Sequence, residues 1–154
     1  MMIELRTRQN NPISNEQFTG HLPYKDIADN IEFMRTYLNC CYRTEPTGIY
    51  NCHGLTFASR RTRIYDNTDL RRILFEDGYF PVNDDSIYPG DIILYVNRKG
   101  DIIHSGFVLN VNKIGDIKIP MVLSKWGNGS EVCHAFNNCP YYEYNINIEY
   151  HRVK

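Results

Sequence analysis

The sequence predicts an α+β fold in which N-terminal helices pack on a C-terminal antiparallel sheet. Apolar residues recur at helical spacing in the first half of the chain, whereas runs rich in β-branched and aromatic residues fill the second half. The change comes at 89–91, where the sequence Pro-Gly-Asp precedes the first of these runs. Helices followed by a meander of strands are typical of the α+β class.

The beginning of the chain is expected to form an arm. Residues 1–22 are polar and irregular, so we expect an N-terminal arm there and a single domain over 23–154. The 154-residue length and 42% hydrophobic content suit one globular core. In 24–38, apolar side chains recur every three or four residues, which predicts the first helix.

Two more helices are predicted before the strands begin. The second covers 52–61, after a loop that contains Pro46. The third covers 68–77, because Thr68 is a suitable N-cap and Gly78 suits the position after the helix end.

Strand patterns dominate the remaining sequence. Short turn segments separate several of these runs, so consecutive strands are expected to pair as antiparallel hairpins. The predicted strands cover 91–97, 102–110, 117–123 and 144–152.

Composition and charge limit the partners that we expect. The formal net charge is −1, without the basic excess that binds nucleic acid or anionic lipid. No apolar run approaches the roughly 18 residues of a membrane helix. We therefore expect no nucleic-acid partner and no membrane partner.

The cysteines and the first residues indicate the compartment. Five cysteines form an odd set without a CxxC pair, which favours a reducing environment. The first eight residues lack the apolar run of a secretory signal. We expect a cytoplasmic protein, or an effector or toxin that a specialised secretion apparatus delivers, with a cognate inhibitor or secretion partner as a further possibility.

Cys52 is the candidate nucleophile. It lies at the expected start of the second helix, where unpaired N–H groups and the helix dipole favour a thiolate. Gly54 allows backbone or substrate to approach closely in the first turn. The Cys52 backbone N–H is then placed to help hold an oxyanion.

His104 is the candidate general base. It lies early in the second predicted strand, and a strand holds an imidazole rigidly near a helix start. Gly106, two residues later, leaves space on the same face of the sheet.

A third residue is needed to orient the imidazole. If the next hairpin is centred near residue 114, Ser124 faces His104, whereas a one-residue slip would place Leu123 or Lys125 there. His134 is the alternative orienting residue.

Aromatic residues near these positions are candidates for substrate binding. Tyr50 and Trp126 are the best placed, and the tyrosine-rich segment 140–142 is a further candidate. Cys133, His134 and Cys139 could form a metal site with Cys52, but their spacings match no zinc module. We therefore expect no metal and no organic cofactor.

The order of three motifs resembles a known superfamily. These are YNCHGL at 50–55, PGDIILY at 89–95 and HSGFV at 104–108. Together they resemble the papain-like cysteine hydrolases of the NlpC/P60 and CHAP kind, over about residues 46–126. The resemblance implies a papain-like, NlpC/P60-type fold, with Cys52 as nucleophile and His104 as base. Members usually orient that base with His, Asn, Asp, Glu or Gln, and Ser124 departs from this pattern.

The resemblance also implies a reaction. A cysteine amidohydrolase or thiol protease of this kind cleaves an amide bond through an acyl-enzyme, in a peptidoglycan peptide or in a protein side chain or isopeptide. An acyltransferase, a transglutaminase-like enzyme or a deamidase would use the same site. A catalytically silent binding module of the same fold is the alternative outside enzymes.

Overall fold

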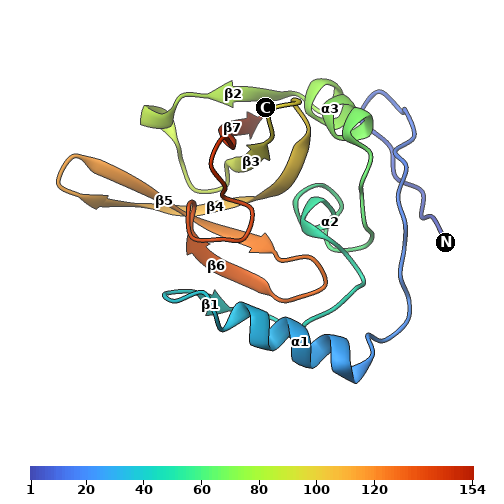
Figure 1. Cartoon of the computed structure of the whole chain (residues 1–154). Coiled ribbons are helices and arrows are strands. Elements are labelled where there is room, and N and C mark those ends of the chain that lie inside the picture. Colours follow the sequence, from blue (N-terminus) through green and yellow to red (C-terminus); the bar gives the residue numbers. More distant parts are fainter.

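One seven-stranded antiparallel sheet dominates the fold, which we describe from a computed structural model of residues 1–154 (Figure 1). The strand order is β1-β6-β5-β4-β3-β7-β2. The strands are β1 (Cys41–Tyr42), β2 (Tyr79–Val82), β3 (Ile92–Val96), β4 (Ile102–Ile114), β5 (Ile117–Lys125), β6 (Glu131–Ala135) and β7 (Asn147–Val153). The helices are α1 (Tyr24–Met34), α2 (Cys52–Phe57) and α3 (Asn67–Glu76), with a short 3-10 turn at Asp84–Ser86.

The predicted fold class is wrong. The structure is mostly β, with three short helices of 11, 6 and 10 residues, and it is not a papain-like α+β arrangement of N-terminal helices on a C-terminal sheet. Both edges of the sheet, β1 and β2, come from segments that precede the Pro-Gly-Asp at 89–91 where the strands were expected to begin. The helices are too short to form a layer that covers a seven-stranded sheet. None of them has the length and apolar character needed to cross a membrane.

Two of the helices end earlier than their periodicity predicts. The helix predicted over 24–38 ends at Met34, which is its one buried residue. The helix predicted over 52–61 ends at Phe57, because Ser59 and Arg60 take left-handed backbone conformations with φ of 50° and 67°. A short apolar period therefore overestimates helix length where a turn follows.

The third helix lies close to its predicted position. Its N-cap is Asp66, whose carboxylate accepts a hydrogen bond from the Asp69 N–H, so the expected Thr68 cap is wrong by two residues. Gly78 follows the helix end with a φ of +79°, as its predicted role requires. Leu70 and Leu74 turn the buried face of α3 toward the sheet.

The hairpin of β4 and β5 sets the geometry of the site. Its pairing starts at Ile114 and Ile117, shifts at a bulge before Asn110, and ends where Gly106 faces Ser124. Beyond that pair, β4 is bonded to β3 alone and β5 continues beside β6. Helix α2 packs against both β4 and β5.

The sheet has a hydrophobic cluster on each face. One cluster joins α3 to side chains of β3, and the other gathers Met34, Tyr95 and Trp126. The two faces follow the alternation of side chains along each strand.

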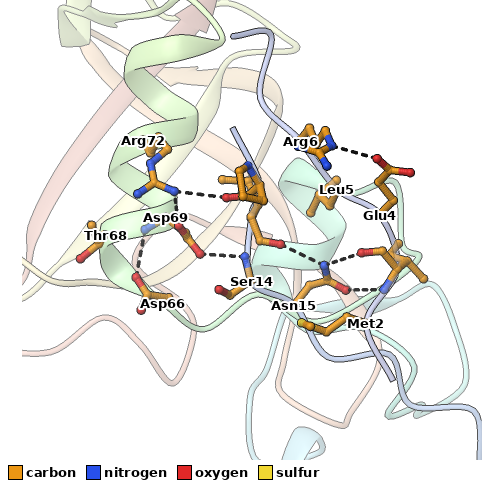
Figure 2. Close-up of a pocket in the computed structure, with 13 residues that line it drawn as sticks. Met2, Glu4, Leu5, Arg6, Ser14, Asn15, Asp66, Thr68, Asp69 and Arg72 are labelled. Atoms are coloured by element: carbon orange, nitrogen blue, oxygen red, sulfur yellow. Dashed lines mark hydrogen bonds and ion pairs between the residues drawn. The ribbon is translucent and has the colours of Figure 1, made fainter. Parts of the chain in front are cut away.

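The N-terminal arm lies against α3. Ile13 is buried in the α3 cluster, and the Ser14 N–H donates to Asp69 at 2.8 Å (Figure 2). The Asn15 side chain bonds back to the Ile3 N–H and carbonyl. Together the arm and α3 enclose a cavity of about 610 Å³, which includes neither Cys52 nor His104.

Candidate active site

Cys52 lies at the first position of α2, as its sequence context predicts. The Asn51 side chain caps this helix by accepting from the Gly54 N–H at 2.8 Å. The backbone N–H groups of Cys52, His53 and Ser105 face the sulfur and favour its thiolate. The residue is 8% exposed, so α2 presents its sulfur to the sheet rather than to open solvent.

The thiol of Cys52 is protonated at neutral pH. Burial raises the pKa of the Cys52 thiol to about 11, and this outweighs the backbone N–H groups and the nearby charge of Lys125. The expectation that the helix start populates a thiolate is therefore wrong for this structure. A six-residue helix supplies too little field to offset complete removal of the sulfur from water.

His104 lies on β4, where its backbone faces Tyr95 of β3. Its side chain is completely buried, and neither ring nitrogen has a hydrogen-bonding partner. The ring stacks on Tyr141, with 3.7 Å between ring centroids and 11° between planes. Burial holds the pKa of His104 well below its ordinary value, so the imidazole is neutral.

The structure brings Cys52 and His104 to the same corner without a hydrogen bond between them. The sulfur faces the N–H of Ser105, the residue directly after His104. Successive side chains along β4 point to opposite faces of the sheet. The Ser105 hydroxyl points toward α2, and the His104 imidazole points to the other face. This corner lies where β4 and β5 part. Burial, and after it a negative charge on Cys52, raises the pKa of Tyr141, the phenol stacked on His104.

Ser124 and His134 pair with each other and leave His104 without an orienting partner. The Ser124 hydroxyl lies 2.7 Å from His134 Nε2, and His134 Nδ1 lies 2.7 Å from the Ala135 carbonyl. Since a carbonyl accepts, Nδ1 donates and Nε2 accepts from Ser124. Neither candidate orients His104 in this structure.

The hairpin register explains the position of Ser124. Gly106, and not His104, faces Ser124, so the predicted register is displaced by two residues. The turn at Gly115 lies later than expected, and the bulge before Asn110 changes the pairing again. An even displacement keeps Ser124 on the predicted face.

The two predicted substrate-binding aromatics are buried. The Tyr50 hydroxyl donates to Glu131 at 2.5 Å, and the Lys125 ammonium lies 5.1 Å from its ring centroid. Trp126 packs edge-on against Tyr37 and His134. Both residues therefore support the fold around the corner and do not line an open cleft.

Sequence reasoning missed two residues of this corner. The sequence indicates Lys125 only as a register alternative, and its burial depends on the packing of α2 and the preceding loop over the end of β5. Tyr141 was noted only as part of a tyrosine-rich segment. Its position over His104 depends on a loop after β6 that the pattern did not place.

The other four cysteines have one another as neighbours and not Cys52. Cys41 faces Cys133 across β1 and β6, while Cys40 and Cys139 lie near each other by the same edge. Nowhere do three side chains of His, Cys, Asp or Glu gather in a way that could hold a metal ion.

The corner thus combines a thiol, a neutral imidazole and a buried ammonium. This set can form and stabilise a sulfur nucleophile. Neither protein-family models, nor curated proteins, nor solved structures give a match to this chain.

Proposed function

We propose that this protein is a cysteine-dependent amide hydrolase, with Cys52 as the nucleophile and His104 as the general base. One observation carries the proposal: His104 is completely buried with both nitrogens unpaired, one residue from the N–H that faces the Cys52 sulfur. A buried polar group without a partner costs about 1–3 kcal/mol. An unpaired buried imidazole on the residue next to that N–H favours a chemical role over a structural one.

The protonation states support general-base catalysis. The neutral imidazole accepts the proton of the Cys52 thiol as the sulfur attacks the amide carbonyl carbon. The carbon–sulfur bond forms, the amine leaves with the proton, and water then releases the acyl group. Because the thiol has the higher pKa, proton transfer accompanies attack rather than preceding it. The imidazole has to turn toward the sulfur for this step.

The substrate we propose is an amide in a peptidoglycan peptide or in a protein side chain. The order of the motifs around Cys52, Asp91 and His104 supports this reaction class through its resemblance to NlpC/P60 and CHAP hydrolases. The sheet-dominated architecture differs from the fold that the resemblance implies. The resemblance therefore supports the reaction class and no specific substrate.

Product analysis with matched variants tests the proposal. Purified protein is incubated with peptidoglycan fragments and with a cytosolic proteome, and new amines and cleaved peptides are identified by mass spectrometry. We expect Cys52→Ala to abolish product formation and His104→Asn to reduce it by about 10²-fold or more. Cys41→Ala and His21→Asn, two exposed matched controls, retain activity. Activity that survives Cys52→Ala would refute the assignment.

Burial of the site favours a second candidate, a binding module without turnover. Cys52 is buried and the imidazole lies under Tyr141, so substrate reaches neither group without movement. Such a module binds a partner and forms no product. The same incubation separates the two functions, because a module leaves both substrate sets unchanged. Products that carry an added amine in place of water would instead indicate acyl transfer on the same site.

A further inference from the structure

Lys125, the last residue of β5, is a completely buried ammonium. Its Nζ donates to the carbonyl oxygens of Thr47 at 2.7 Å and Gly127 at 2.6 Å. An ammonium has three N–H donors, so one remains beyond these two bonds. A buried charge is costly unless an opposite charge compensates it.

The neighbouring carboxylate is already neutralised by another residue. Glu131 faces Lys125 across β5 and β6, but Arg60 binds it through two hydrogen bonds of 2.5 and 3.1 Å. The Tyr50 hydroxyl also donates to Glu131. Lys125 forms no ion pair with any carboxylate.

The contacts of Lys125 lead to the loop that carries Cys52. Thr47 lies five residues before Cys52, in the loop that leads into α2. The ring of Tyr50, two residues before Cys52, has its centroid 5.1 Å from the Lys125 Nζ. The opposite charge that acts most strongly on Lys125 is that of a Cys52 thiolate. The ammonium therefore touches the loop before Cys52 and acts on its sulfur.

We propose that Lys125 is a positioning residue for Cys52: it anchors the loop that delivers the sulfur and stabilises the negative charge that forms there. This inference rests on the proposed function of Cys52 as a nucleophile. It adds the cation that a buried sulfur requires when it loses its proton to His104.

The charge of Lys125 itself changes near neutral pH. Burial lowers the pKa of Lys125 to about 8, a Cys52 thiolate raises it, Arg63 lowers it and Glu131 raises it. Below about pH 8 the reactive ammonium–thiolate form grows about tenfold per pH unit. Above it, the neutral amine with a neutral thiol dominates. That form carries the same number of protons as the ammonium–thiolate form, so the reactive population stops rising.

The pH profile of Cys52 alkylation tests the inference without any substrate. Iodoacetamide labelling of the Cys52 peptide is followed by mass spectrometry from pH 6 to 10. The wild-type rate should rise up to about pH 8, flatten over roughly one pH unit, and then rise again as the thiolate beside the neutral amine becomes populated. Lys125→Met should lower the rate at pH 7 about tenfold and remove the break. Lys125→Arg, whose guanidinium stays charged, should keep the rate at pH 7 and also remove the break.

Controls separate this inference from the proposed function. Lys118→Met, on the same strand but partly exposed, should retain the wild-type profile, break included. A wild-type rate that rises about tenfold per pH unit throughout roughly pH 6–10 would overturn the titration of Lys125 beside Cys52, and equal rates at about pH 7 in the wild type and Lys125→Met would overturn its role in stabilising the thiolate. If the wild type hydrolyses substrate and the labelling profile of Lys125→Met is unchanged, the role of Lys125 is refuted and the proposed hydrolase activity is kept. A labelling profile that shows the break, together with no hydrolysis of any substrate, would refute the proposed hydrolase activity and keep the charge coupling between Lys125 and Cys52.

Discussion

The ring of Tyr141 lies parallel to the imidazole of His104 at 3.7 Å between centroids. Tyr95 lies beside the same imidazole, with its ring centroid at 5.2 Å. The two phenol rings therefore enclose His104 in aromatic surface, which explains both its complete burial and its lowered pKa. Tyr141 belongs to a loop rather than to the sheet, so it is the wall that a substitution can remove.

Replacing Tyr141 is expected to expose the corner. Tyr141→Leu removes the stacked ring, so water reaches the imidazole and the pKa of His104 should rise toward its ordinary value. Labelling of Cys52 should accelerate in the same variant. NMR titration of the histidine ring and iodoacetamide kinetics measure the two effects.

The matched variant is Tyr141→Phe. It keeps the stacked ring and loses only the hydroxyl, so both readouts should stay at wild-type values. If Tyr141→Leu leaves the His104 titration unchanged, Tyr95 and the sheet alone determine its burial.

The cysteines should differ widely in reactivity. Cys41 is exposed and should label first, whereas Cys52 is buried with a thiol pKa of about 11 and should label slowly. At pH 7, a thiol with that pKa is ionised to about one part in ten thousand. Peptide mass spectrometry after brief alkylation gives the order, and denatured protein gives the reference. Faster labelling of Cys52 than of Cys41 in the native protein would contradict the closed corner.

Stability should fall in mild acid. Burial lowers the pKa of His53 and of His134 to about 4, whereas both take up protons near pH 6.5 in the unfolded chain. Between these values the unfolded state binds more protons, so the free energy of unfolding rises with pH. Acidification from about pH 6.5 to 4 should cost up to about 3 kcal/mol per histidine. Urea unfolding across this range measures the slope.

A single histidine variant tests the assignment of that slope. His134→Gln removes one of the three buried rings, His53, His104 and His134, that take up a proton on unfolding in this range, so the remaining slope should correspond to about one proton fewer. An equally steep slope in His134→Gln would assign the acid sensitivity to other groups.

Gly54 should tolerate no side chain. A Cβ atom there would lie 1.8 Å from the Thr62 carbonyl oxygen, which is backbone and has no rotamer to change. We expect Gly54→Ala to lower the free energy of unfolding by about 3 kcal/mol or more. Chemical denaturation measures the loss. Gly20→Ala is the matched control, since the nearest atom is the movable ring of Phe18 at 3.1 Å. Equal stability of the two variants would show that α2 shifts freely.

Local sequence patterns predicted the elements with strong signals. The apolar runs that became β3, β4, β5 and β7 were predicted as strands, and α3 was predicted within one residue at each end. The start of α2 at Cys52 was also predicted. Strands β1, β2 and β6 were missed, because two to five residues that contain Cys, Pro or His carry little alternation.

Sequence alone thus determined four of the strands, the position of α3 and the placement of Cys52 at the start of α2, because neighbouring residues decide these features. Tertiary structure decided which strands form the edges of the sheet, and with them the fold class. It also decided that Ser124 pairs with His134, that Tyr141 covers His104, and that Lys125 is buried near Cys52. These relationships join residues far apart in the chain, and one turn or bulge changes all of them at once.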